Sequence, residues 1–157
     1  MKLSMSGVIW ASLIAGAVFL AMEMMLIMLA GDGNVWGPPR MMAAIVMGTD
    51  VLPPPATMDL TIVMVGMMVH FALSVVLGII LGLGISSMGI GMVPAVLLGG
   101  VFGLITYGVN FYGFTALFPW FEMARTWITV SSHIVFGAVL GGVYRAMAAA
   151  PKATIAT

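Results

Sequence analysis

The sequence predicts an all-α integral membrane protein, a four-helix bundle with a short interfacial helix in its first loop. Of the 157 residues, 62% are hydrophobic and only 6% are charged, whereas soluble domains are about half apolar and about a quarter charged. Four apolar runs each exceed the roughly 20 helical residues that cross a hydrocarbon core. Such segments must be helical, because backbone groups in lipid find no other hydrogen-bond partners. The length suits a single transmembrane domain, residues 1–157.

The apolar runs fix the expected helices. The predicted spans are residues 7–30, 60–85, 92–118 and 124–149. The first run follows a lone Lys2 but is longer than the apolar core of a signal peptide, so we expect a retained helix. Residues 39–48 lie between two proline clusters, and Pro39 suits a helix start. They are expected to form the interfacial helix.

The charges indicate the orientation of the chain in the membrane, and the lack of cysteine excludes some kinds of site. Lys2, Arg145 and Lys152 lie beside the termini, whereas Arg40 and Arg125 lie on the opposite side among acidic residues. This bias favours cytoplasmic termini. Net charge is zero, so nucleic acid is not an expected partner. The chain has no cysteine, which excludes disulfides and thiolate metal sites.

The chain reads as two copies of one helical hairpin. His70 and His133 are each followed by Val-Leu-Gly ending eight residues on, at Gly78 and Gly141. The loop after the first helix of each hairpin carries a Trp and an Arg. These are Trp36 and Arg40 in the first hairpin, and Trp120 and Arg125 in the second. Parallel repeats of two helices would be related by an axis along the membrane normal. Chance similarity between apolar segments is the alternative.

Small residues at four-residue spacing predict close helix packing. They are Ser74, Gly78, Gly82, Gly99, Gly103, Gly137 and Gly141. The 17 Met residues are scattered through apolar helices. We therefore interpret them as flexible apolar filler, since a copper pathway would need Met and His grouped near a membrane surface.

Polar residues inside the apolar runs are the main functional clue. Counted from the side opposite the termini, they lie at a similar depth, about 10–15 Å from the ends of their helices at 1.5 Å per residue. They are Glu23, His70, Asn110 and His133, with Tyr107 one turn deeper than Asn110. His70 and His133 are possible axial ligands of haem b. A quinone pocket, a proton relay and a structural hydrogen-bond network without cofactor stay open as alternatives.

The Trp and Arg residues of the loops are expected to be interfacial anchors, with an anion site as the alternative. They are Trp36, Arg40, Trp120 and Arg125. No phosphate-binding loop, nucleophile elbow or zinc-protease motif occurs. A non-catalytic subunit is therefore favoured.

Several short motifs resemble a group of small prokaryotic four-helix membrane proteins, some of them labelled symporters. The motifs span most of the chain: Trp36–Arg40, Val51–Pro55, His70-Phe71, Asn110–Phe114, Leu117–Trp120 and His133–Gly137. The resemblance implies a location in the prokaryotic inner membrane. Some such proteins are similar to accessory chains of respiratory oxidases.

Three functions are therefore expected candidates. The first is an accessory subunit of a larger membrane complex, a respiratory haem–copper oxidase above all, with lipid and other membrane subunits as partners. The second is a redox protein that binds haem b or quinone. The third is an oligomeric transporter of a small solute or of protons.

Overall fold

The computed structural model describes residues 2–31, 34–52, 54 and 57–149, and these are helical with no strand among them. Four helices are long and apolar enough to span a membrane, which confirms the predicted class of multi-pass membrane protein. They are α1 (Met5–Ala30), α3 (Leu60–Met88), the segment Met92–Ala116 that begins with α4 (Met92–Gly108), and α5 (Trp127–Ala149). The predicted interfacial helix is α2 (Gly37–Met47), with Pro38 and Pro39 in its first turn.

Local sequence signals explain where α1 and α3 begin and where α3 ends. Ser4 caps α1 by accepting a hydrogen bond from the backbone N–H of Gly7, and Asp59 caps α3 through the N–H of Ile62. α3 ends at Gly89, whose φ of 61° is left-handed backbone that glycine adopts without strain. The turn from α3 to α4 follows directly.

The third span runs from Met92 to Ala116, close to the predicted residues 92–118, but its last turns are not α-helical. α4 stops at Gly108 instead of residue 118, and the chain continues through a π-helical turn and two 3-10 turns. These are η2 (Val109–Gly113), η3 (Phe114–Ala116) and η4 (Pro119–Ala124). Pro119 disfavours helical backbone at Phe118, which has φ −127° and ψ 76°. α5 consequently begins at Trp127 and not at residue 124.

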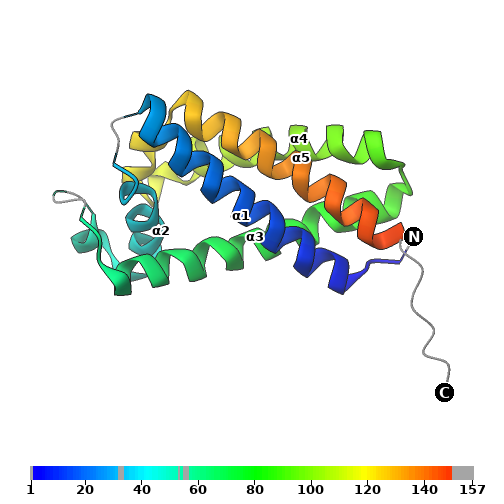
Figure 1. Ribbon diagram of the computed structural model, residues 1–157, viewed down its shortest axis with the longest axis horizontal. Coiled ribbons are helices and arrows are strands. Elements are labelled where there is room, and N and C mark those ends of the chain that lie inside the picture. The colour runs from blue at the N-terminus through cyan, green and yellow to red at the C-terminus, as the bar shows by residue number, and fades with distance from the viewer. Residues whose placement is uncertain (1, 32–33, 53, 55–56, 150–157) are drawn as a thin grey trace, which may run out of the picture.

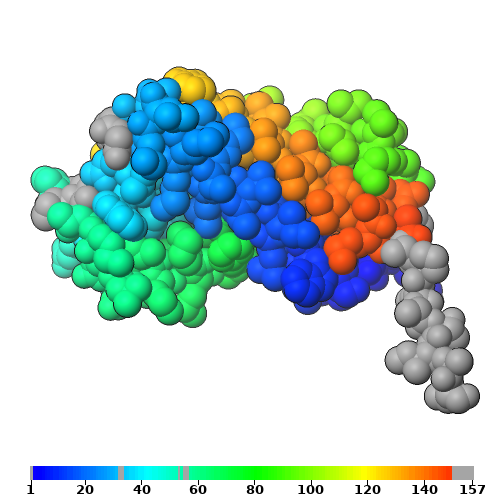
Figure 2. Space-filling model, in the orientation of Figure 1, coloured from blue at the N-terminus to red at the C-terminus, as the bar shows by residue number. Residues whose placement is uncertain are grey.

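The four spans form a row. α3 packs on α1, α1 on α5, and α5 on α4, whereas α3 makes few contacts with α4. Figure 1 shows α1 crossing between α3 and α5, and Figure 2 shows the same order of helices on the molecular surface. An exact hairpin repeat would pack α3 on α4 as closely as α1 on α5, so the repeat does not extend to the tertiary packing.

The two ends of the row differ. The start of α1 and the end of α5 meet at one end, here called the proximal end (Figure 1). The opposite, distal end holds α2 and the turns η2 to η4. α2 packs on α3 there, and a short 3-10 turn, η1 (Thr49–Val51), follows it.

The seven predicted small residues all lie at contacts between helices. A Cβ atom on Gly99 would collide with the carbonyl oxygen of Gly137, and one on Gly103 with that of His133. α4 and α5 thus touch backbone to backbone. Between α3 and α1, Gly78 faces the Ser12 side chain. Gly82 faces Val8 and Tyr144, and Ser74 lies against Gly16.

Candidate functional site

The two histidines are buried in the middle of the bundle around Phe19. His70 is 6% exposed and His133 is 5% exposed. The Phe19 ring contacts both imidazoles, at centroid distances of 5.4 Å and 4.9 Å. His70 Nε2 donates to the carbonyl of Gly16 at 3.1 Å, which ties α3 to α1. His133 Nδ1 donates to the carbonyl of Thr129, one turn earlier in α5, at 2.8 Å.

A haem does not fit between these histidines. Phe19 touches both rings, and Tyr107 and Phe111 pack on His133 at 5.8 Å and 5.4 Å between centroids. A flat macrocycle would have to displace these aromatic side chains. His70 Nε2 is already engaged with the Gly16 carbonyl, whereas the bond of His133 uses Nδ1 and does not occupy its Nε2. The geometry therefore fits a network that fixes helix register better than an axial ligand pair.

Glu23 lies one turn beyond Phe19 on α1, nearer the distal end, and is 6% exposed. The Thr129 hydroxyl donates to its Oε1 at 3.1 Å. Oγ1 of Thr129 also lies 3.2 Å from Oγ1 of Thr126. Thr126 is exposed at the start of α5, where its side chain accepts from the N–H of Thr129. A short ladder of two hydroxyls thus connects the buried carboxyl with the distal surface.

No cation neutralises Glu23 within the described residues. Arg125 pairs with exposed Glu122 at 3.4 Å. The Arg40 guanidinium donates to the carbonyl oxygens of Val51 and Thr57. Removing an unpaired carboxylate from water is costly, so this carboxyl favours either its neutral form or an external cation.

The structure does not bring Asn110 into the polar cluster. It lies in the π-helical turn and is partly exposed, and its side chain makes no hydrogen bond with another described residue. The apolar run predicts a position inside a continuous helix, but that helix ends at Gly108. Tyr107, still within α4, is buried and packs on His133.

The predicted anchor residues brace the distal end. Trp120 Nε1 donates to the Met41 carbonyl at 3.2 Å, which joins η4 to α2. Arg125 donates to the Phe111 carbonyl at 2.7 Å and lies over the Tyr112 ring. Trp36 precedes α2, and its backbone N–H donates to the Asn34 side chain at 3.1 Å.

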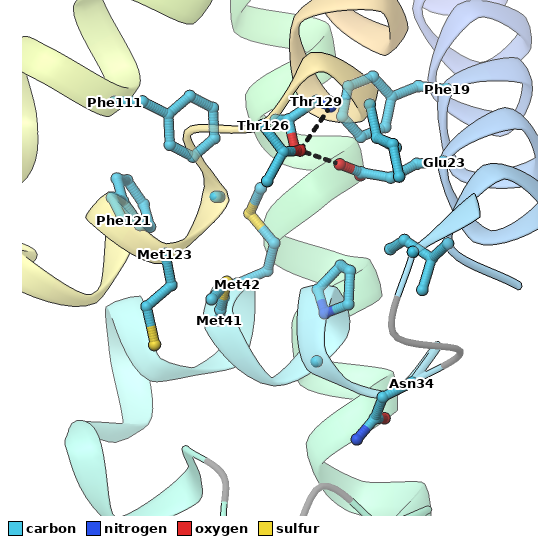
Figure 3. A pocket seen from close by; sticks show the side chains of 16 residues that line it. Phe19, Glu23, Asn34, Met41, Met42, Phe111, Phe121, Met123, Thr126 and Thr129 are labelled. Carbon is cyan, nitrogen blue, oxygen red and sulfur yellow. Dashed lines mark hydrogen bonds between the residues drawn. The ribbon is translucent and has the colours of Figure 1, made fainter.

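A pocket of about 500 Å³ opens at the distal end beside Glu23. Its walls come from the end of α1, the start of α2, the turns η2 and η4, and the start of α5. Phe19, Phe111 and Phe121 line it together with Met41, Met42 and Met123. Figure 3 shows Glu23 pointing toward Thr129 across one wall of this space, with Met41 and Met42 on α2 below them. Pockets of this size accept drug-sized molecules.

Sequence reasoning missed most of this pocket. Met41 and Met42 belong to α2 and Met123 to η4, so their gathering depends on loop structure that apolar periodicity does not encode. Thr129 had a weak signal, since it precedes His133 by one helical turn. Phe19 resembles any other apolar residue of its run.

These features define the class: a four-span membrane protein with one buried carboxyl in the wall of an apolar pocket. Among the described residues, no three His, Cys, Asp or Glu side chains group to hold a metal ion. Comparison with protein-family models, curated proteins and solved structures finds no match to this chain.

Proposed function

We propose that this protein binds a small, mostly apolar solute in the distal pocket, as the first step of small-solute transport. The observation that carries the proposal is the pocket itself, about 500 Å³ of mainly apolar lining with Glu23 as its one charged side chain among the described residues. A mostly apolar pocket with a few polar groups, here Glu23, Asn34, Thr126 and Thr129, is typical of a binding site for a small molecule. On the inner side of the pocket, toward the middle of the bundle, Phe19 packs against His70 and His133 and forms its floor.

Filling the pocket tests this proposal. Gly37 lines it, and a Cβ atom added there would have no other atom within 4 Å, so Gly37→Trp adds bulk to the pocket from an open backbone position. Gly91, at the proximal end, is equally open, and Gly91→Trp is the matched control. We expect Gly37→Trp to weaken binding of two probes, decylubiquinone and methyltriphenylphosphonium, by about tenfold or more, since each 1.4 kcal/mol of lost contact is tenfold in affinity.

Calorimetry on the purified protein in detergent measures both affinities. The proposal predicts that at least one probe binds and that Gly91→Trp leaves its affinity unchanged. If neither probe binds the wild-type protein, or if both variants bind equally well, the pocket is not a solute site.

The orientation that we propose places the termini in the cytoplasm and the pocket on the outer side of a prokaryotic inner membrane. Lys2 and Arg145 lie at the proximal end, and the positive-inside rule supports this arrangement. The chain has no cysteine, so single cysteines report topology directly. In intact cells a membrane-impermeant maleimide should label Met58→Cys at the distal end and spare Met88→Cys at the proximal end, and the reverse pattern would contradict the orientation. Both side chains are about half exposed.

The role of accessory subunit in a respiratory haem–copper oxidase remains a separate proposal. Its support is the small size and the rows of exposed apolar side chains on α3 and α4. The packing glycines do not support it, because they are occupied by contacts within this chain. Migration from native membranes as a free small particle, without an oxidase, would count against it.

A further inference from the structure

We propose that the solute of the distal pocket is a lipophilic organic cation that takes the place of the Glu23 proton. This inference rests on the proposed binding function and deepens it by naming the solute class and the exchanged proton. Three features of the pocket carry it: the Glu23 carboxyl, which is the one carboxyl among its described lining residues, the aromatic walls and the hydroxyl ladder to the surface.

The carboxyl gives the pocket its charge preference. Of the two Glu23 oxygens, Oε1 accepts from Thr129, and Oε2 has no hydrogen-bond partner among the described residues. No other charged side chain lines the pocket in the described part of the chain. An ionised carboxylate there is unpaired until a cation enters, and pairing inside an apolar site is much stronger than in water.

The walls favour an organic cation over a neutral carbonyl compound. Phe19, Phe111 and Phe121 present ring faces or edges to the pocket, and aromatic faces attract cations. The methionine side chains that line the pocket are polarizable and adapt to irregular shapes. A quinone would instead need a donor for each of its two carbonyl groups, and the neutral Glu23 carboxyl can serve only one of them. The hydroxyls of Thr126 and Thr129 are already engaged with each other and with Glu23.

The threonine ladder supplies the route for the proton. Thr129 donates to Glu23 and therefore accepts from Thr126, with oxygen separations of 3.1 Å and 3.2 Å. Both hydroxyl hydrogens can rotate, so the chain of donors can also run from a protonated Glu23 outward to Thr126. Inward of Thr129 the chain is interrupted, because His133 Nδ1 meets a carbonyl, which carries no transferable proton.

The exchange balances in charge and atoms. The neutral carboxylic acid of Glu23 releases its proton through Thr129 and Thr126 to the distal aqueous phase, and the cation pairs with the resulting carboxylate. No bond other than O–H breaks, and no redox partner is needed.

Other titratable groups around Glu23 must be distinguished from it. His70 on α3, Tyr107 on α4 and His133 on α5 lie on the inner side of Phe19 or next to it. On the distal side, Arg40 of α2 is bound to backbone carbonyls, and Glu122 and Arg125 pair with each other. Glu122→Gln is therefore the matched control for Glu23→Gln.

The test is calorimetric titration with methyltriphenylphosphonium, whose charge does not depend on pH, in buffers of different ionisation enthalpy. We expect the wild-type protein to release protons on binding, up to one per cation at low pH. Its affinity should rise by about tenfold per pH unit until Glu23 is ionised, as proton linkage requires. Glu23→Gln should lose both the proton release and the pH dependence, with affinity reduced by about tenfold or more.

Two further variants test the ladder. Thr129→Ser keeps the hydroxyl and should behave as the wild type, whereas Thr129→Val should slow proton release relative to cation binding in stopped-flow measurements with a pH dye. Glu122→Gln should change nothing.

The outcomes separate the inference from the function. If decylubiquinone binds and the cation does not, the binding function stands and the inference about the solute class is overturned. If the cation binds without proton release at low pH as well as at high pH, or if Glu23→Gln binds it as tightly, the exchange is overturned. If neither probe binds, both proposals fail.

Discussion

Gly99→Ala is expected to destabilise the protein strongly, whereas Gly100→Ala, one residue away, is expected to leave it intact. A Cβ at position 99 collides with the backbone carbonyl of Gly137. Neither partner is a flexible side chain, so α4 and α5 must separate, and we expect a loss of about 3 kcal/mol in the free energy of unfolding. A Cβ on Gly100 meets only the Ile134 side chain at 3.9 Å, an ordinary contact.

Unfolding in mixed micelles, followed by circular dichroism, measures the difference. Both substitutions replace Gly by Ala in the same helix, so the gain in helix propensity cancels between them. Equal stability of the two variants would show that α4 and α5 do not pack backbone to backbone.

Arg40→Met is expected to be the second large effect, and to exceed Arg125→Met clearly. Arg40 is 7% exposed and donates to the carbonyls of Val51 and Thr57, with all three bonds between 2.8 Å and 3.0 Å. Its removal leaves both acceptors without this partner, and we expect a loss of about 3 kcal/mol. The Arg125 side chain is 30% exposed, so water can replace its bonds at a cost of about 1 kcal/mol.

The same unfolding assay compares the two arginine variants, and limited proteolysis shows whether the chain after α2 becomes accessible. An Arg40→Met variant as stable as Arg125→Met would mean that Arg40 acts only as an interfacial anchor. Arg40→Lys should fall between the wild type and Arg40→Met, because an ammonium cannot bind both carbonyls in the guanidinium geometry.

The membrane class and the spans were predictable because bilayer physics acts on simple quantities, length and apolarity. The buried polar residues were predictable for a similar reason, since Glu23, His70 and His133 stand out in apolar runs. Their partners were not. Hydrogen bonds from His70 to Gly16 and from Thr129 to Glu23 join distant parts of the sequence, and only the order of helices in the row decides them.

The distal end was the least predictable part. Residues 109–118 continue the apolar stretch of the third span, so the sequence predicts an unbroken helix there. The backbone instead forms a π-helical turn and a 3-10 turn. Asn110 was misplaced for that reason. The hairpin repeat likewise predicted that α3 packs on α1 and that α5 packs on α4. It did not predict that α3 and α4 make few contacts with each other.

Infrared difference spectroscopy on the purified protein, with and without methyltriphenylphosphonium, tests the central claim most directly: that Glu23 is the polar contact for a solute in the distal pocket. At a pH where the carboxyl is neutral, we predict loss of one carboxylic acid band and gain of a carboxylate band on binding. The change should be absent in Glu23→Gln and retained in Glu122→Gln. Binding of the probe with no carboxyl change that depends on Glu23 would contradict the claim.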